Sequence, residues 1–284
     1  MSSRANGRWS VRAWISAAIA TIVVSGSVNA ADLAPVYKAA PAVAAPVAYS
    51  WTGFYLGGNV GVIWNDTRAD PLSFTTTGVD FSGRQAVGQF PSFNVRDTAF
   101  TGGAQAGYNF QFGSNWVAGI EADINYSGLK KTDTRVFPVT PFIGGGFIDA
   151  NTESATQKLG WLGTVRGRLG FTTLNNRLLA FATAGLAYGQ VDDSIYTIGV
   201  PNGAGPFLIS ASSSSVRVGW TAGGGLEYAF ASNWRAKVEY LYYDLGRRNL
   251  TLDYAPIPGD ANNTITYKFH NNGNLVRVGL NYNF

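Results

Sequence analysis

Hydrophobic and polar residues alternate with a period of two from Trp51 to the last residue of the chain. Eight segments carry this pattern, which is typical of β-strands. They lie at residues 51–64, 99–112, 116–127, 156–171, 178–190, 214–230, 234–243 and 274–284. The pattern predicts an all-β protein.

The connections between these segments alternate strictly between short and long. The short ones are residues 113–115, 172–177 and 231–233, and the long ones are 65–98, 128–155, 191–213 and 244–273. Membrane barrels have this asymmetry, with tight periplasmic turns and long extracellular loops. We therefore expect an eight-stranded antiparallel transmembrane up-and-down β-barrel with both termini in the periplasm. A count of ten strands stays open if parts of 65–98 or 191–213 pair beyond the membrane.

Each predicted strand has one apolar face and one polar face. In 116–127, Ile120 and Ile124 lie opposite Glu121 and Asp123. In 156–171, one face carries Leu159, Trp161, Val165, Leu169 and Phe171, and the other carries Thr164, Arg166 and Arg168. A slip of one residue would turn such arginines toward lipid, so the register is strongly specified.

Two kinds of closed barrel have this alternation, and the aromatic residues discriminate between them. A soluble barrel of the lipocalin kind turns its apolar face inward, whereas a membrane barrel turns it outward. Aromatic residues gather at both ends of the apolar faces, as two membrane interfaces require. At the short-turn end they are Phe112, Trp116, Phe171, Phe230, Trp234 and Phe284, and at the long-loop end Trp64, Tyr126, Trp161, Tyr188 and Tyr242. We expect the apolar faces to meet lipid, and Phe284 looks like the signal read by the outer-membrane assembly machinery.

The polar faces then point into the lumen and bring opposite charges together. The expected lumen network consists of Glu121, Asp123, Arg166, Arg168, Arg217, Glu227, Arg235, Lys237, Glu239 and Arg277. An eight-stranded interior is just wide enough for side chains to fill it. We expect a structural plug, with a narrow conduit for ions or small solutes as the alternative. For a plug, neutralising Arg166 and Arg168 together should raise conductance and lower thermal stability.

The N-terminal region predicts export and cleavage. Three arginines precede a largely apolar, uncharged stretch at 14–28, and small residues precede a cleavage point after Ala30. Residues 1–30 are therefore expected to be a signal peptide. Residues 31–50, rich in Ala and Pro, are expected to form a periplasmic linker, and 51–284 the barrel.

Composition narrows the function. Removing the signal takes away three arginines and no acids, so the net charge falls from +4 to +1, and no basic footprint for nucleic acid is left. There is no cysteine, and His270 is the only histidine. We expect no catalytic residue, metal site or cofactor; a surface enzyme or a rim receptor for a small ligand is the remote alternative.

Several strings, taken together, resemble the alphaproteobacterial small outer-membrane porin-like, or immunogenic, protein family. They lie at residues 31–33, 51–58, 163–170, 182–189, 219–227, 240–246 and 276–284. The resemblance implies a barrel like the outer membrane protein A transmembrane domain, located in the bacterial outer membrane. It also implies a structural envelope protein with surface loops, whose expected partners are outer-membrane lipid, lipopolysaccharide, the assembly machinery, and host or phage surfaces.

Overall fold

The computed structural model describes residues 49–75, 89–142, 146–148, 150–200, 206–254 and 263–284. The predicted signal peptide and almost all of the predicted linker lie outside these residues. The strands are β1 (Gly53–Thr75), β2 (Phe93–Phe112), β3 (Trp116–Ser127), β4 (Lys130–Phe137), β5 (Thr140–Phe142), β6 (Gly146–Ile148), β7 (Ala150–Thr173), β8 (Leu178–Val200), β9 (Phe207–Ala229), β10 (Trp234–Asp253) and β11 (Thr264–Asn283). None of the described residues belongs to a helix long and apolar enough to cross a membrane.

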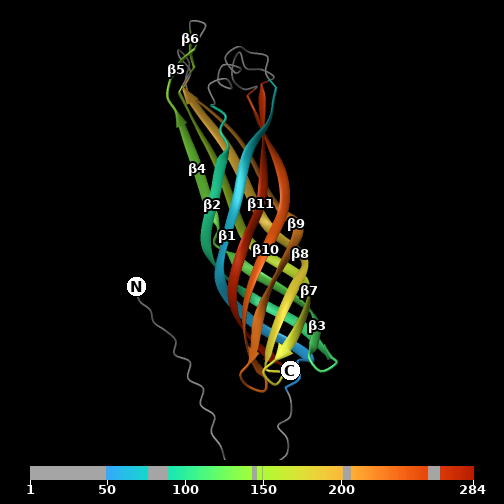
Figure 1. Ribbon diagram of the computed structural model, residues 1–284. Coiled ribbons are helices and arrows are strands. Elements are labelled where there is room, and N and C mark those ends of the chain that lie inside the picture. Colours follow the sequence, from blue (N-terminus) through green and yellow to red (C-terminus); the bar gives the residue numbers. More distant parts are fainter. Residues whose placement is uncertain (1–48, 76–88, 143–145, 149, 201–205, 255–262) are drawn as a thin grey trace, which may run out of the picture. The chain divides into compact units, whose positions relative to one another are not determined.

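The long strands form a closed antiparallel ring (Figure 1). Around the ring the order is β3, β2, β1, β11, β10, β9, β8 and β7, and the pairing of β3 with β7 closes it. β4 continues the position of β3: β3 pairs with β7 up to Tyr126 opposite Trp161, and β4 takes over at Lys130 opposite Lys158. The predicted eight-stranded antiparallel barrel is confirmed. β5 and β6 form a separate two-stranded sheet.

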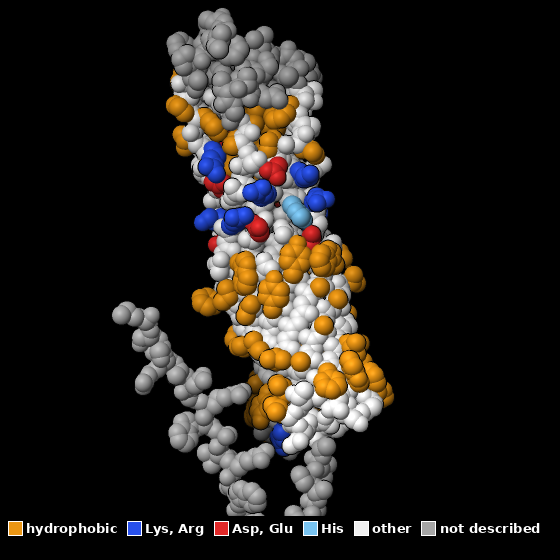
Figure 2. All heavy atoms as spheres, in the orientation of Figure 1, with side chains coloured by type: hydrophobic (Ala, Val, Ile, Leu, Met, Phe, Trp, Pro, Cys, Tyr) orange, Lys and Arg blue, Asp and Glu red, His pale blue; other side chains and the backbone are white. Residues whose placement is uncertain are grey.

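The lower part of the barrel wall is apolar on the outside, as the alternation predicts. Exposed apolar side chains cover it, including Leu56, Val60, Ile120, Ile124, Val165, Leu169, Leu186, Val218, Leu226, Val238, Val276, Val278 and Leu280. On the face that Figure 2 shows, hydrophobic side chains (orange) form a band toward the short-turn end. Cross-strand aromatic pairs border the band, with Trp234–Tyr282 on the short-turn side and Trp220–Tyr242 on the long-loop side. We call this surface the apolar band.

One of the predicted outward residues faces the lumen instead. Leu159 is only 4% exposed and packs inside with Leu162. The cause is a register shift in the pairing of β7 with β8 between these two residues, which reverses the alternation. The period-two reading is therefore correct for Val165 and Leu169 and wrong for Leu159.

At least half of each predicted long loop is in fact strand. β1 continues past Trp64 to Thr75, β8 reaches Val200, and β11 begins at Thr264. Above the apolar band the same alternate positions still point outward and inward. However, polar residues now take the outward positions and apolar residues take the inward ones. On β11, exposed Val276 and Val278 give way to the polar outward residues His270 and Lys268, and buried Arg277 gives way to buried Phe269.

The buried side chains of this upper part form an apolar core of their own. It contains Ala69, Phe90, Phe93, Val95, Ala155, Ile195, Ile209, Leu250, Leu252, Tyr254, Ile265, Tyr267 and Phe269. Alternation with apolar residues inside and polar ones outside is the pattern of a water-exposed sheet. The strands extend beyond the membrane because they bury this second core.

Two seams interrupt the wall of the upper part. The pairing of β9 with β10 ends at Trp220 opposite Asp244, and β2 has ladder partners in β3 only from Thr101 downward. Among the described residues, side chains bridge the seams: Asp133 accepts a bond from the Asn94 amide at 3.0 Å, and Arg248 donates to Ser215 at 2.8 Å. The upper part therefore consists of two four-stranded sheets, β4-β7-β8-β9 and β2-β1-β11-β10, that face each other across the second core.

Candidate functional site

The structure brings nine of the ten predicted lumen residues into one cluster inside the apolar band. Strands β3, β7, β9, β10 and β11 supply them, and each of the nine is at most 5% exposed. They are Glu121, Asp123, Arg166, Arg168, Glu227, Arg235, Lys237, Glu239 and Arg277. Register places some partners directly opposite each other on paired strands, as with Glu121 and Arg166. We call this cluster the lumen network.

Arg166 lies at the centre of the lumen network. Its guanidinium contacts Glu121 at 2.5 Å, Glu239 at 2.6 Å and Asp123 at 2.8 Å. Its Nε also donates to the hydroxyl of Thr164 at 2.8 Å. Three carboxylates thus surround one buried guanidinium, an arrangement that offsets the cost of burying each charge.

Arg277 and Lys237 complete this central group. Arg277 donates to Glu239 through Nε at 2.8 Å and to Asp123 through Nη2 at 2.8 Å. The Lys237 ammonium lies 2.8 Å from Oε1 of Glu121. Because most of these bonds join strands that are not neighbours, they fix the cross-section of the lumen.

A second group lies closer to the short turns. Arg168 donates to Glu227 at 2.7 Å, and its guanidinium lies 4.1 Å above the ring of Phe181. Arg235 lies 3.7 Å from Glu227 and 5.0 Å from the Trp51 ring centre. The aromatic faces supply favourable contacts to guanidinium groups in a region without bulk water.

Two polar residues that were not among the predicted site residues belong to the network: Tyr55 joins the two groups, and Asn281 extends the second. The Tyr55 hydroxyl donates to Glu121 at 2.7 Å and accepts from Arg168 at 3.0 Å. Asn281 donates to the second oxygen of Glu227 at 2.9 Å. Their position on the inward side of β1 and β11, between apolar outward neighbours such as Leu56 and Leu280, was the available signal.

The structure places Arg217 outside the lumen network. It lies on β9 opposite Gly189, above the last residue of β9 that pairs with β10. Its Nη2 donates to the backbone carbonyl of Arg247 on β10. Arg217 therefore bridges a seam in the upper wall.

Apolar layers lie above and below the lumen network. The layer on the short-turn side consists of Trp51, Val117, Leu179, Phe181 and Ala229. The layer on the long-loop side consists of Ile63, Leu129, Leu159, Leu162, Ala187, Val191, Leu241, Tyr243, Leu245 and Leu275. The second layer, which we call the apolar seal, separates the charges from the upper part of the barrel.

A small polar shelf lies above the apolar seal. Asn65, Gln157 and Asn271 are linked by side-chain hydrogen bonds, and Asn271 donates to Asp193 at 3.2 Å. A neighbouring interior cavity holds only about 10 Å³. Asp193 is beyond the apolar band and 2% exposed, and desolvation raises the pKa of its carboxyl to about 6.

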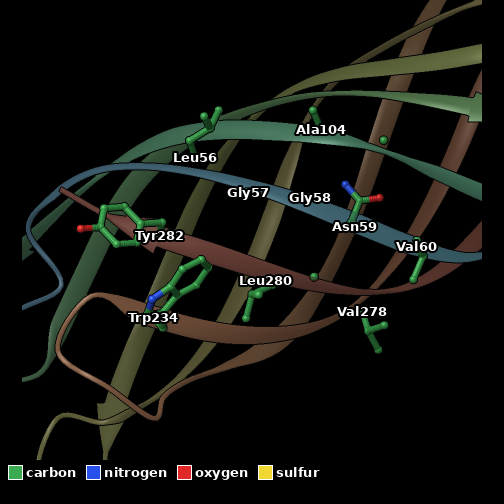
Figure 3. Close-up of a pocket in the computed structure, with 12 residues that line it drawn as sticks. Leu56, Gly57, Gly58, Asn59, Val60, Ala104, Trp234, Val278, Leu280 and Tyr282 are labelled. Carbon is green, nitrogen blue, oxygen red and sulfur yellow. The ribbon is translucent and has the colours of Figure 1, made fainter.

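The larger hollow is on the outside of the barrel. A groove of about 770 Å³ is lined by Leu56, Gly58, Val60, Leu280 and Trp234, among others. Figure 3 shows how these residues lie around it. It exists because Gly58 and its neighbours on β2 carry little or no side chain. Since it opens on the apolar band, lipid is its natural contact.

Candidate chemistry is sparse in the described part of the chain. His270 is half-buried on the outer surface, and its Nε2 lies 3.1 Å from Asp244. Within the described residues, no group of three His, Cys, Asp or Glu side chains could hold a metal ion. Phe284, the predicted assembly signal, is 74% exposed and contacts Tyr282 edge to face at 5.1 Å.

Comparison with known proteins decides the family. A family model described as the outer membrane protein beta-barrel domain matches residues 33–284. The chain belongs to the outer membrane protein beta-barrel domain family. Within it, the chain is 37% identical over 259 residues to a 31 kDa outer-membrane immunogenic protein of Brucella melitensis, covering 91% of this chain and 94% of that protein.

A further relative is also an outer membrane protein. A 22 kDa outer membrane protein of Rhizobium leguminosarum is 30% identical over 211 residues, covering 74% of this chain and 72% of that protein. Among solved structures, the outer membrane protein OprG from Pseudomonas aeruginosa aligns with a TM-score of 0.43 and 11% identity, over 83% of this chain and 97% of that one. The expected family and the bacterial outer-membrane location are confirmed.

Proposed function

We propose that this protein is a structural component of the outer membrane whose lumen is closed and whose upper strands carry surface-exposed loops. The observation that supports this most directly is the buried lumen network between two apolar layers. A conduit needs a continuous path of water through the lumen. The side chains of the apolar seal offer water few hydrogen-bond partners at that height of the lumen. The alternative, a narrow porin for ions or small solutes, has no comparable observation in its favour.

We further infer that the protein is not an enzyme. His270 and Asp244 form a pair on the outer surface, and among the described residues no serine is hydrogen-bonded to either side chain. A hydrolytic site would require a nucleophile beside the base. The proposed partners are therefore those of an envelope protein: lipid, lipopolysaccharide, the assembly machinery through Phe284, and host or phage surfaces through the loops.

Single-channel conductance in a planar bilayer tests the closed lumen. The folded protein, verified by its heat-dependent gel mobility, should remain electrically silent. Resolved and reproducible conductance steps would instead support the porin.

The apolar seal also changes what charge neutralisation should do. Replacing Arg166 and Arg168 with glutamine should lower stability. The protein should still conduct no current in the bilayer, because the apolar seal consists of other residues. Adding Leu241→Ser and Leu275→Ser to that variant should then permit current. If the two arginine substitutions open the pore by themselves, the seal has no such role.

A further inference from the structure

A belt of charged side chains crosses the face of the barrel that Figure 2 shows, directly above the apolar band. On strands β1, β2, β10 and β11 this belt is hollowed to a volume of about 480 Å³. The charged and titratable side chains that line it are Asp66, Arg68, Asp70, Arg96, Arg247, Lys268 and His270. We call this hollow the outer cationic pocket.

Strand register brings the members of the pocket together from distant parts of the sequence. His270 on β11 is the direct partner of Arg68 on β1 and of Arg247 on β10. Lys268, two residues from His270 on β11, points to the same outward face. Arg96 on β2 lies opposite Asp66 on β1. Four strands thus bring four cationic side chains, Arg68, Arg96, Arg247 and Lys268, together with the two carboxylates Asp66 and Asp70 on one surface.

A bulge in β10 aims Arg247 into this surface. Asp244 pairs with Asn272 and Arg247 pairs with His270, so β10 has one more residue than β11 between these two pairs. Gly246, with φ of 79°, takes up the extra residue in a backbone conformation that side chains disfavour. Leu245 remains inside, and Arg247 points outward.

The cationic side chains in the pocket, Arg68, Arg96, Arg247 and Lys268, outnumber its carboxylates, Asp66 and Asp70. Arg96 pairs with Asp66, and His270 pairs with Asp244. Arg68, Arg247 and Lys268 form no ion pair with any residue that the structure describes. Three cationic groups in one hollow are suited to a group with several negative oxygens, such as phosphate.

The height of the pocket identifies the source of that phosphate. Directly below it, Asn274 lies opposite Trp64 and Tyr242, and Tyr240 donates to Asn274 at 2.6 Å. Aromatic residues of this kind sit at the level of lipid headgroups. The outer cationic pocket is therefore next to the headgroups of the outer leaflet, where basic pockets on membrane proteins bind lipid phosphates.

We propose that the outer cationic pocket binds a phosphate group of a glycolipid in the outer leaflet. Arg68, Arg247 and Lys268 hold the phosphate oxygens, and the acyl chains of the same lipid lie against the apolar band beneath. The belt would then bind lipid specifically, in addition to marking the edge of the membrane.

The test measures binding of lipid A to the protein purified from outer membranes, delipidated, and placed in phosphatidylcholine nanodiscs. Native mass spectrometry compares bis-phosphorylated lipid A with dephosphorylated lipid A of the same acyl chains. The proposal expects binding of the phosphorylated form to be at least about tenfold tighter, since charge-assisted bonds are lost without phosphate. Equal binding of the two forms would overturn it, and this comparison needs no variant.

A matched pair of variants places the site. Arg68→Gln, Arg247→Gln and Lys268→Gln together should abolish the preference for phosphorylated lipid A. A control with the same change in charge, Lys130→Gln, Lys131→Gln and Arg135→Gln on exposed positions of β4, should keep it. Equal loss in both would show general electrostatic attraction, and competition by inorganic phosphate at the same concentration as lipid A would show a site for soluble anions; either outcome overturns the proposal.

Discussion

Arg166 and Glu239 form an ion pair of 2.6 Å across the lumen, although their strands, β7 and β10, are not neighbours in the ring. Both side chains are fully buried. The pair therefore connects two parts of the wall that no backbone ladder joins, because ladders link only neighbouring strands.

Replacing Arg166 with alanine should destabilise the barrel strongly. It leaves Glu121, Asp123 and Glu239 with fewer partners in a buried site, and removing one member of a buried pair costs about 3–5 kcal/mol. The midpoint of urea unfolding, followed by gel mobility, should fall accordingly. Arg96→Ala is the control, because it breaks an exposed pair with Asp66 and should cost less than about 1 kcal/mol. Similar losses for both variants would contradict a structural role of the lumen network.

The buried Asp193 should make stability depend on pH. Its folded pKa, raised by desolvation to about 6, exceeds the unfolded value of 3.8. The folded state thus favours the protonated carboxyl, so this contribution is fully present below pH 3.8 and is lost as pH rises through 6. The difference of about 2 pKa units corresponds to roughly 3 kcal/mol.

Asp193→Asn isolates this contribution, because the amide imitates the neutral carboxyl. The variant should match the natural protein in free energy of unfolding at pH 3.5 and exceed it at pH 7.5. Urea titrations at both values measure the difference. A variant that is less stable at pH 7.5 would show that the ionised carboxylate is needed.

Two glycines on β1 should respond differently to alanine. A Cβ on Gly61 would lie 2.2 Å from the carbonyl oxygen of Val276 and 2.7 Å from Cα of Arg277, both backbone atoms. At Gly58, in the groove of Figure 3, the nearest atom would be 3.7 Å away. Gly61→Ala should cost about 1–3 kcal/mol by overpacking, and Gly58→Ala should be close to neutral. Thermal melting of both proteins in the same detergent compares them directly.

Alternation in the sequence predicts the side of the wall on which a residue lies, and this sufficed for most of the lumen network. It does not predict height along the barrel. Arg217 has the inward parity of Glu227, but it lies above the paired part of β9 and reaches Arg247 across a seam. Height depends on the stagger between strands, which only the pairing reveals.

Two other features, the bulges and the upper core, limited what the sequence could predict. One register shift in β7 turns Leu159 inward, and nothing in the local residue pattern marks it. Beyond Trp64 the sequence still alternates, but apolar residues such as Ala69 take the inward positions. A search for apolar residues on the lipid-facing side therefore ends at the membrane and mistakes the upper strands for loops.

This exchange of faces has a consequence for immune recognition of the protein. Along the upper part of β1 an antibody meets Asp66 and Arg68 but not the buried Thr67 and Ala69, which alternate with them. The residues beside Arg68 on this surface come from the paired strands β11 and β2, not from the adjoining sequence of β1. Epitopes on these flanks are therefore discontinuous. A short synthetic peptide copying β1 would display the side chains that the barrel buries and would lack the neighbours from β11 and β2. The folded barrel is needed to reproduce the antigen.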